Sequence, residues 1–372
     1  GGKTGLYEFI NGALVRYHNQ DNSPLKGAVD RGKVLDNNHV LISAIKFDNN
    51  GHLWVLNNQT EGVTLLEFDP VNNKWTDHHN KALTNENGIG KHTFRSMFID
   101  SRQLLWFVND SWVEPAVFCC DMESDIVIRY DDFVNQDGQR YTISWITCVC
   151  EDKEGNIWIG TDKGPFMIKK SEVGQSSVTF TQIKIPRNDG SDYADYLLNG
   201  VSISSIAIDG GNRKWFGSDN AGAFLISADN MKQLQSFTTA NSKLISDNIA
   251  YITINPTSGE VFFLSDNGLC SYQSDATEAN ETMDDNNVYA YPNPVTPDYT
   301  GLITITGLTY DADVKITASN GALIAQGRSN GGMFTWDGCD KKGRRVASGI
   351  YMVVTAPSDG NSGTICKIAI VN

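Results

Sequence analysis

The first three quarters of the chain repeat one pattern of apolar and polar positions. An apolar run rich in β-branched residues ends at Asp or Asn, a polar turn follows, and a second apolar run carries an aromatic residue. Such runs between turn residues are typical of antiparallel strands joined as hairpins. We expect the first strand of each copy at Ile42–Phe47, Phe94–Ile99, Ile146–Glu151, Ile203–Ile208 and Ile249–Ile254.

The second run of four copies carries a tryptophan at a regular interval. Trp54, Trp106, Trp158 and Trp215 lie 52, 52 and 57 residues apart. Third and more polar fourth strands follow in most copies, and a period of this length with four strands per copy is typical of β-propeller blades. We therefore expect these tryptophans in the core between blades, where truncation to alanine would cost about 3–5 kcal/mol.

The turn before each tryptophan has some features of a binding loop. Residues 151–162, EDKEGNIWIGTD, combine acidic residues with glycine. A calcium loop needs oxygen ligands in the spacing D-x-[DN]-x-[DN]-G, which no copy has. A phosphate loop needs a helix to follow, whereas a strand is predicted here. We interpret the string as a structural turn.

The first strands share a column of mostly small residues next to branched apolar ones, which suits the crowded inner strands of a propeller. The column consists of Ala44, Ser96, Cys148, Ser205 and, as the exception, Tyr251. We predict an all-β propeller of about six four-stranded blades over residues 1–273. Residues 6–10 and 13–17 would be the outer strands of a sixth blade. Its inner strands either precede residue 1 or come from the last copy, which would close the ring.

The pattern changes near residue 274. Residues 274–287 are polar and acidic without an apolar period, which predicts a linker. Residues 288–372 contain short alternating runs separated by Gly and Asn, which predict a small immunoglobulin-like β-sandwich. Trp336 is its expected core anchor. Pro292 and Pro294 should place the first strand at a sheet edge.

Composition narrows the function classes. The net charge of −14 argues against nucleic acid as a partner. No apolar run approaches the ~18 residues of a membrane span, and residues 1–5 do not resemble a signal peptide, which suggests a mature or shortened chain. The seven cysteines include no CxxC pair, so neither a zinc site nor a complete disulfide framework is indicated.

The chain lacks the common catalytic motifs, such as G-x-S-x-G, H-E-x-x-H or a P-loop. His78 and His79 lie on a polar fourth strand, which favours a solvated face over a metal site. We expect a protein that is not an enzyme, with no catalytic residue, no metal and no cofactor.

Ligand binding is the better hypothesis. Loops that lead into the innermost strands converge at one end of a propeller channel, and a mix of aromatic, amide and charged side chains suits a sugar or a protein loop. Ordinary loop polarity explains these residues equally well. Trp112, on a loop between strands, is a further candidate contact. The candidate binding residues are His39, His92, Arg95, Arg140, Tyr141, Trp145, Asn199, Asp247 and Asn248.

The repeat over residues 1–275 resembles the two-component regulator propeller of Bacteroidota sensors and surface proteins. The C-terminal order YPNPV, GLITITGL, FTWDGCDKKGRRVASGIYMV and KIAIVN resembles the C-terminal sorting domain of type IX secretion cargo. That resemblance implies export to the cell surface of a Gram-negative Bacteroidota cell, with the terminal residues 367–371 matching the targeting segment. Non-sorting sandwich modules share the WDG and SGIY features, so a non-sorting role stays open.

The combination of the two parts resembles the PorZ-like family of type IX secretion components. The resemblance implies a sortase (PorU-like) and other attachment-complex proteins as partners, with anionic lipopolysaccharide or another glycan as ligand. A secreted glycan-binding or adhesin-like cargo protein is the alternative. A propeller polysaccharide lyase would need an acid–base pair, which only His39, His92 and the tyrosines could supply.

Overall fold

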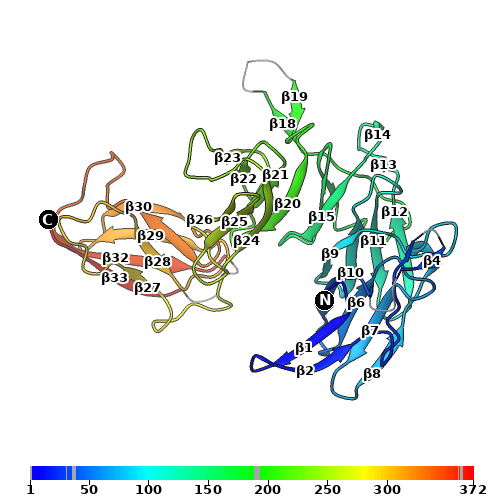
Figure 1. Cartoon of the computed structure of the whole chain (residues 1–372). Coiled ribbons are helices and arrows are strands. Elements are labelled where there is room, and N and C mark those ends of the chain that lie inside the picture. Colours follow the sequence, from blue (N-terminus) through cyan, green and yellow to red (C-terminus); the bar gives the residue numbers. More distant parts are fainter. Residues whose placement is uncertain (1, 31, 36–38, 188–192, 359, 361–362) are drawn as a thin grey trace. The chain divides into compact units, whose positions relative to one another are not determined.

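The structure is a computed structural model that describes residues 2–30, 32–35, 39–187, 193–358, 360 and 363–372. The described residues form β-strands and one short 3-10 helix, η1 (Lys81–Leu83), so the chain is all-β, as predicted (Figure 1). It divides into two compact units, residues 1–206 and 207–372, and strand β20 (Ile203–Ile208) crosses the division. Among the described helices, none has the length and apolar character needed to span a membrane.

Two four-stranded sheets and one three-stranded sheet form most of the first unit. In each sheet the strands pair antiparallel in chain order, as in a propeller blade. The three sheets consist of β5 (Ile42–Phe47), β6 (Leu53–Asn57), β7 (Leu65–Asp69) and β8 (Lys74–Asp77); β9 (Phe94–Ile99), β10 (Leu104–Asn109), β11 (Ala116–Asp121) and β12 (Ile126–Tyr130); and β15 (Ile146–Glu151), β16 (Ile157–Thr161) and β17 (Gly164–Ile168).

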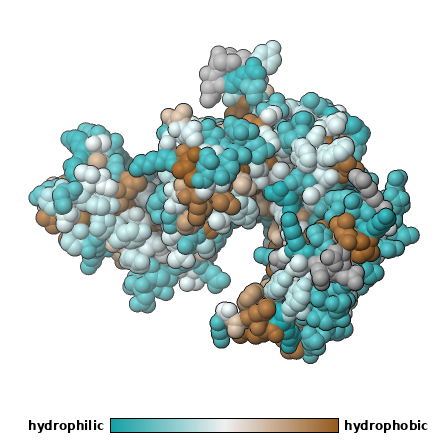
Figure 2. Space-filling view, viewed as in Figure 1, coloured by the Kyte–Doolittle hydropathy of each residue, from teal (hydrophilic) through white to brown (hydrophobic). Residues whose placement is uncertain are grey.

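Short two-stranded sheets complete this unit. They pair β1 (Leu6–Ile10) with β2 (Ala13–His18), β3 (Val29–Asp30) with β4 (Lys33–Val34), β13 (Phe133–Val134) with β14 (Arg140–Tyr141), and β18 (Lys184–Pro186) with β19 (Ala194–Tyr196). Figure 2 shows apolar side chains over β1 and β2, where Phe9, Ile10 and Leu14 are exposed. An exposed apolar hairpin fits the outer strands of a blade, which stays a prediction.

The third sheet lacks a regular fourth strand, which the repeat pattern predicts at residues 178–183. That segment makes only an isolated bridge between Met167 and Thr181. Two of its N–H groups bond to the β13–β14 hairpin instead: that of Phe180 donates to the carbonyl of Val134 and that of Gln182 to the Gln136 side chain. The Phe180 ring stacks on Phe133 at 4.0 Å between ring centroids. Burial of this ring in the hairpin therefore replaces regular strand pairing.

An aspartate at the start of each turn explains why the turn recurs. In four copies, one carboxylate oxygen accepts backbone N–H groups of the turn and the other accepts the indole N–H of the tryptophan six residues later. Because a buried indole N–H needs an acceptor, each aspartate both closes its turn and fixes its tryptophan. The Nε1–Oδ2 distances are 3.1 Å for Trp54 with Asp48, 3.0 Å for Trp106 with Asp100, 2.9 Å for Trp158 with Asp152 and 3.2 Å for Trp215 with Asp209.

Close packing explains the small residues of the first strands. Gly160 pairs with Cys148 across the β15–β16 ladder. A Cβ atom on Gly160 would lie 2.5 Å from the Cys148 sulfur and 2.9 Å from a methyl carbon of Ile203. Cys148 is therefore a packing residue in a space that no larger neighbour can share.

The second unit holds two further blade-like sheets and a two-layer sandwich. The blade strands are β21 (Lys214–Ser218), β22 (Ala223–Ile226) and β23 (Gln233–Phe237), then β24 (Ile249–Ile254), β25 (Glu260–Ser265) and β26 (Gly268–Gln273). One sandwich sheet has the order β27 (Tyr289–Tyr291), β28 (Ile303–Thr306), β31 (Met333–Trp336). The other has the order β30 (Leu323–Arg328), β29 (Asp313–Ala318), β32 (Gly349–Ala356), β33 (Ile365–Ile370).

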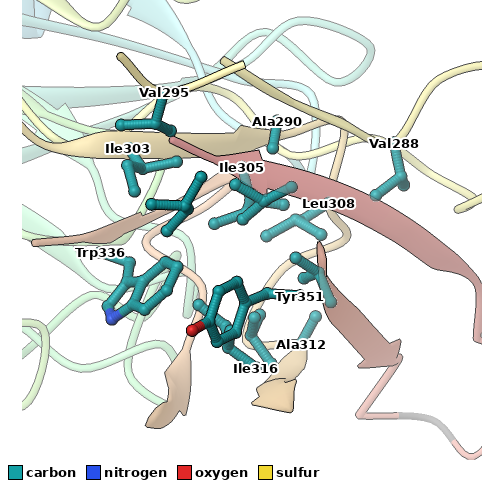
Figure 3. Packing of buried hydrophobic residues seen from close by; sticks show 14 of the residues in the cluster. Val288, Ala290, Val295, Ile303, Ile305, Leu308, Ala312, Ile316, Trp336 and Tyr351 are labelled. Atoms are coloured by element: carbon teal, nitrogen blue, oxygen red, sulfur yellow. The ribbon is translucent and has the colours of Figure 1, made fainter. Parts of the chain in front are cut away.

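Both sandwich sheets contribute to one apolar core (Figure 3). Ile303, Ile305 and Trp336 extend from the first sheet, and Ile316 and Tyr351 from the second. Trp336 is buried, as expected for an anchor, and its indole N–H donates to the carbonyl of Cys339 at 2.9 Å. The WDG stretch is thus a core residue followed by its own hydrogen-bonded turn.

The YPNP stretch covers the free edge of the last strand. The Asn293 amide donates to the carbonyl of Lys367 at 2.8 Å and accepts the N–H of Ala369 at 3.0 Å. Val295 continues this pairing with the backbone of Ala369 and Val371. The prolines donate no N–H, so the Asn293 side chain supplies the hydrogen bonds that a strand backbone would make.

The first residues of the predicted linker are packed inside the second unit. Ser274, Ala276 and Thr277 are buried. Arg213 donates to Asp209, to Ser274 and to Asp275, whose other carboxylate oxygen accepts the amide of Asn330. This network connects the turn before β21 with the loop between β30 and β31 through the linker itself.

Candidate functional site

A pocket of about 620 Å³ opens in the first unit. Its walls come from loops that precede β9 and β15 and from the loop between β10 and β11. His92 and Trp145, two predicted binding residues, line this pocket, as does Trp112. Trp112 is 72% exposed and Trp145 is 43% exposed. Two indole faces are therefore available to a ligand.

A charge pair holds the loop that carries Trp112. Lys91 is buried, and its ammonium group donates to the carboxylate of Glu114. This hydrogen bond lowers the pKa of Glu114. Glu114 has a left-handed backbone with φ of 59°, which costs about 1 kcal/mol outside glycine. The Asn109 amide, which donates to the Glu114 carbonyl at 2.8 Å, stabilises the same turn.

Asp162 positions the second indole. Its carboxylate accepts the N–H groups of Ser144 at 3.0 Å and Trp145 at 3.3 Å. Its own N–H donates to the Trp145 carbonyl. Lys163 forms a 2.8 Å ion pair with the same carboxylate. The backbone of Trp145 is thus fixed while its ring stays exposed.

Neighbouring side chains hold His92 and Arg95 at this pocket. The Gln59 amide contacts Nδ1 of His92 at 2.5 Å. Arg95 is not a lining residue, but it forms a 2.7 Å ion pair with Asp110, which lines the pocket. The cations of the site therefore have carboxylate partners, and the pocket has no unpaired positive group among these residues.

The remaining predicted residues lie elsewhere. His39 is tied through its carbonyl to the N–H of Ala28, and Arg140 pairs with Asp132. Tyr141 packs edge-on against Phe166, and burial raises its pKa. Asn199 is exposed in a turn. In the second unit, Asp247 accepts the N–H of Thr239 at 2.7 Å and Asn248 donates its N–H to Ser246. Their role in binding stays a prediction.

Sequence reasoning missed Lys91 and Glu114, which shape the pocket most directly. A lysine before a strand has no sequence signature of burial, and its partner lies 23 residues away. Pro115 was the only local signal, but a proline favours an extended residue before it, whereas Glu114 is left-handed.

The pocket offers stacking faces and hydrogen-bonding groups. Its lining residues include one histidine and no tyrosine, so the pair of histidine and tyrosine considered for a lyase is not among them. Burial raises the pKa of Cys119 to about 12 and that of Cys148 to about 11, which makes both thiols poor nucleophiles.

Comparisons with known proteins agree with the fold. Residues 141–163 match the family model described as Two component regulator propeller. No curated protein sequence matches the chain. Among solved structures, PorZ of Porphyromonas gingivalis matches with a TM-score of 0.69 and 24% identity, over 100% of this chain and 49% of PorZ. PorZ is an essential bacterial surface component of the type-IX secretion system of that organism.

Two weaker structural matches are to other bacterial proteins. The extracellular domain of a putative one component system from B. thetaiotaomicron matches with a TM-score of 0.35 and 16% identity, over 100% of this chain and 55% of that chain. A putative gluconolactonase matches with a TM-score of 0.42 and 10% identity, over 63% of this chain and 75% of that chain. The predicted fold class is confirmed, and the chain carries a regulator-propeller repeat within a fold that it shares with about half of PorZ.

Proposed function

We propose that this chain is a non-enzymatic binding and scaffold component at the surface of a Bacteroidota cell, comparable with PorZ in type IX secretion and attachment. The fold match over the whole chain supports this proposal. In this proposal, the sandwich of residues 288–372 is a sorting-type domain that stays attached to the chain. A PorU-like sortase and other attachment-complex proteins are its protein partners.

The packed junction is the observation that carries this proposal. A processing protease must bind several residues of extended, accessible chain. Here residues 274–277 are held by Arg213 and Asn330, and Ala276 is fully buried. This packing closes the start of the connection to a protease and favours retention of the sandwich, whereas cargo processing would have to use the mostly exposed residues 278–286.

The tryptophan pocket is the proposed ligand site. Indole faces stack well on the apolar faces of sugar rings, and surrounding polar groups can bond the hydroxyls. Because Lys91 and Arg95 already have carboxylate partners, stacking would contribute more to affinity than charge attraction. A surface glycan, such as the sugar part of anionic lipopolysaccharide, is therefore the proposed ligand.

Native purification from the source cell tests the retention proposal. Intact-mass measurement should find the full C-terminal sandwich, and a sortase should co-purify. A mature protein that ends near residue 274 and carries lipid would instead identify a secreted cargo protein, the alternative function.

Binding to immobilised lipopolysaccharide from the same cell tests the ligand site. Trp112→Ala and Trp145→Ala should each weaken binding by about tenfold, equivalent to about 1.4 kcal/mol. Phe9→Ala, which removes an exposed aromatic ring outside the pocket, is the matched control. Equal losses in all three variants, or none, would contradict a specific site.

A further inference from the structure

The first blade departs from the other copies at positions that face its tryptophan. Across the second and third strands, Trp106 pairs with Cys119, Trp158 with Met167 and Trp215 with Leu225. These partners are all buried and apolar. In the first blade the equivalent partner of Trp54 is Glu67. A carboxylate at a position that packing otherwise fills needs another explanation.

The ring that stacks on the tryptophan also differs. Tyr130 stacks on Trp106 and Phe237 stacks on Trp215. At the equivalent position in the first blade, His78 lies 4.6 Å from Trp54 between ring centroids. The fourth residue after the turn aspartate is His52 here, and Leu104, Asn156 or Arg213 in the other copies. Only this blade therefore combines two histidines with a carboxylate around its tryptophan.

These replacements meet at one place. His52 Nδ1 lies 2.6 Å from one Glu67 oxygen, and His78 Nε2 lies 3.3 Å from the other. Ligand atoms of Asp48, His52 and Glu67 lie within 4.8 Å of one another. Asp69 approaches His52 Nε2 at 3.8 Å, and Asp125 bonds His78 Nδ1. The His52 imidazole and the carboxylates of Asp48 and Glu67 thus converge. The imidazole of His78 contacts the other oxygen of Glu67.

The cluster carries an excess of negative charge. Four carboxylates, those of Asp48, Glu67, Asp69 and Asp125, face two histidines. In the part of the chain that the structure describes, no lysine or arginine forms an ion pair with these four residues. Two other copies differ, because Arg102 pairs with Asp100 and Arg213 with Asp209. In the third copy the Asn156 amide bonds Asp152, and in the first copy His52 stands at that position.

We infer that Asp48, His52 and Glu67 bind a divalent transition-metal ion such as Zn²⁺. Imidazole nitrogen and carboxylate oxygen are its usual ligands at about 2.0–2.2 Å, and two ligands of a tetrahedral ion lie about 3.3 Å apart. A small rotation of the His52 ring, which is about one third exposed, would open its 2.6 Å contact with Glu67 to that separation. Asp48 Oδ2 accepts the Trp54 indole N–H and retains a second lone pair.

His78 is the positioning residue of this site. Its Nε2 contacts Oε2 of Glu67, and its Nδ1 is held by Asp125 from the neighbouring sheet. Such outer partners orient a ligand, and their loss commonly weakens metal affinity about 10–100-fold. The site would therefore tie the β6–β8 strands of one blade to the β11–β12 turn of the next.

Metal titration of the chelator-treated full chain at pH 7.5 tests this inference. We expect one equivalent of Zn²⁺ by calorimetry and one of Co²⁺ by visible absorption, with a Zn²⁺-dependent rise in Tm. Glu67→Leu and His52→Leu should each weaken binding by about tenfold or more. Each variant introduces the leucine that another copy has at the same position, Leu225 for Glu67 and Leu104 for His52. Both variants should therefore fold.

His78→Tyr, which copies Tyr130, should weaken the site while circular dichroism stays unchanged. His92→Ala, which removes a histidine of the separate tryptophan pocket, should bind the metal normally. Absence of a stoichiometric site, unchanged binding in Glu67→Leu, or an equal loss in His92→Ala would each overturn the inference. None of these results depends on the glycan site or on retention of the sandwich.

Discussion

At the residue scale, the turn aspartates do two structural tasks with one carboxylate. In Asp152→Asn, the amide oxygen would still accept the N–H groups of the turn. The amide NH₂ group would then face the Trp158 indole N–H, which would lose its acceptor. We expect a loss of about 2–3 kcal/mol in the free energy of unfolding, measured in urea, because a buried donor is left unpaired. Asp121→Asn, in a turn without a tryptophan partner, should cost much less. Equal losses would mean that the indole bond contributes nothing.

The Cys119 and Cys148 thiols give a second test at this scale. Since burial raises the pKa of Cys119 to about 12 and that of Cys148 to about 11, almost no thiolate forms at pH 8. Peptide mass analysis after iodoacetamide treatment should show both cysteines unmodified in the folded chain and modified in urea. Rapid alkylation without denaturant would show that these strands open readily.

At the scale of elements, the loop of Trp112 should loosen in acid. The hydrogen bond from Lys91 lowers the pKa of Glu114 below its value in the unfolded chain. The pair therefore stabilises the loop above the unfolded pKa, and this contribution disappears as pH falls through the folded pKa. Hydrogen exchange of residues 110–115 should be slower than in Glu114→Gln near pH 6, with the difference vanishing in acid. A difference that persists below the folded pKa would contradict this.

The edge of the last strand is a second case at the element scale. Asn293→Ala removes two hydrogen bonds to β33 and exposes its backbone. We expect a loss of about 1–2 kcal/mol and concentration-dependent association by light scattering, because open edges pair with other strands. Asn320→Ala, which removes one turn bond in the same sandwich, should stay monomeric.

At the scale of the whole molecule, local patterns predicted the architecture better than the sites. The turn aspartates and tryptophans were readable because both ends of each bond lie within seven residues of sequence. The pairing of Lys91 with Glu114 depends on two loops meeting in space, which no local pattern encodes. Phe180 shows the same limit, since an adjacent hairpin took the hydrogen bonds of a strand that its sequence favours. The metal cluster became visible only when cross-strand register placed Glu67 opposite Trp54.

The junction between the last blades and the sandwich provides the last prediction. A Cβ atom on Gly210 would lie 1.6 Å from the carbonyl oxygen of Thr277, a backbone atom that cannot move without displacing the junction. On the adjacent Gly211, the nearest atoms would be 3.4 Å away, an ordinary contact. Gly210→Ala should therefore open residues 274–277 to limited proteolysis and give fragments cut there, while in Gly211→Ala these four residues should stay uncut, as in the native chain, when the fragments are identified by mass. Resistance of both variants would show that the buried junction does not protect the sandwich, and retention would then need another cause.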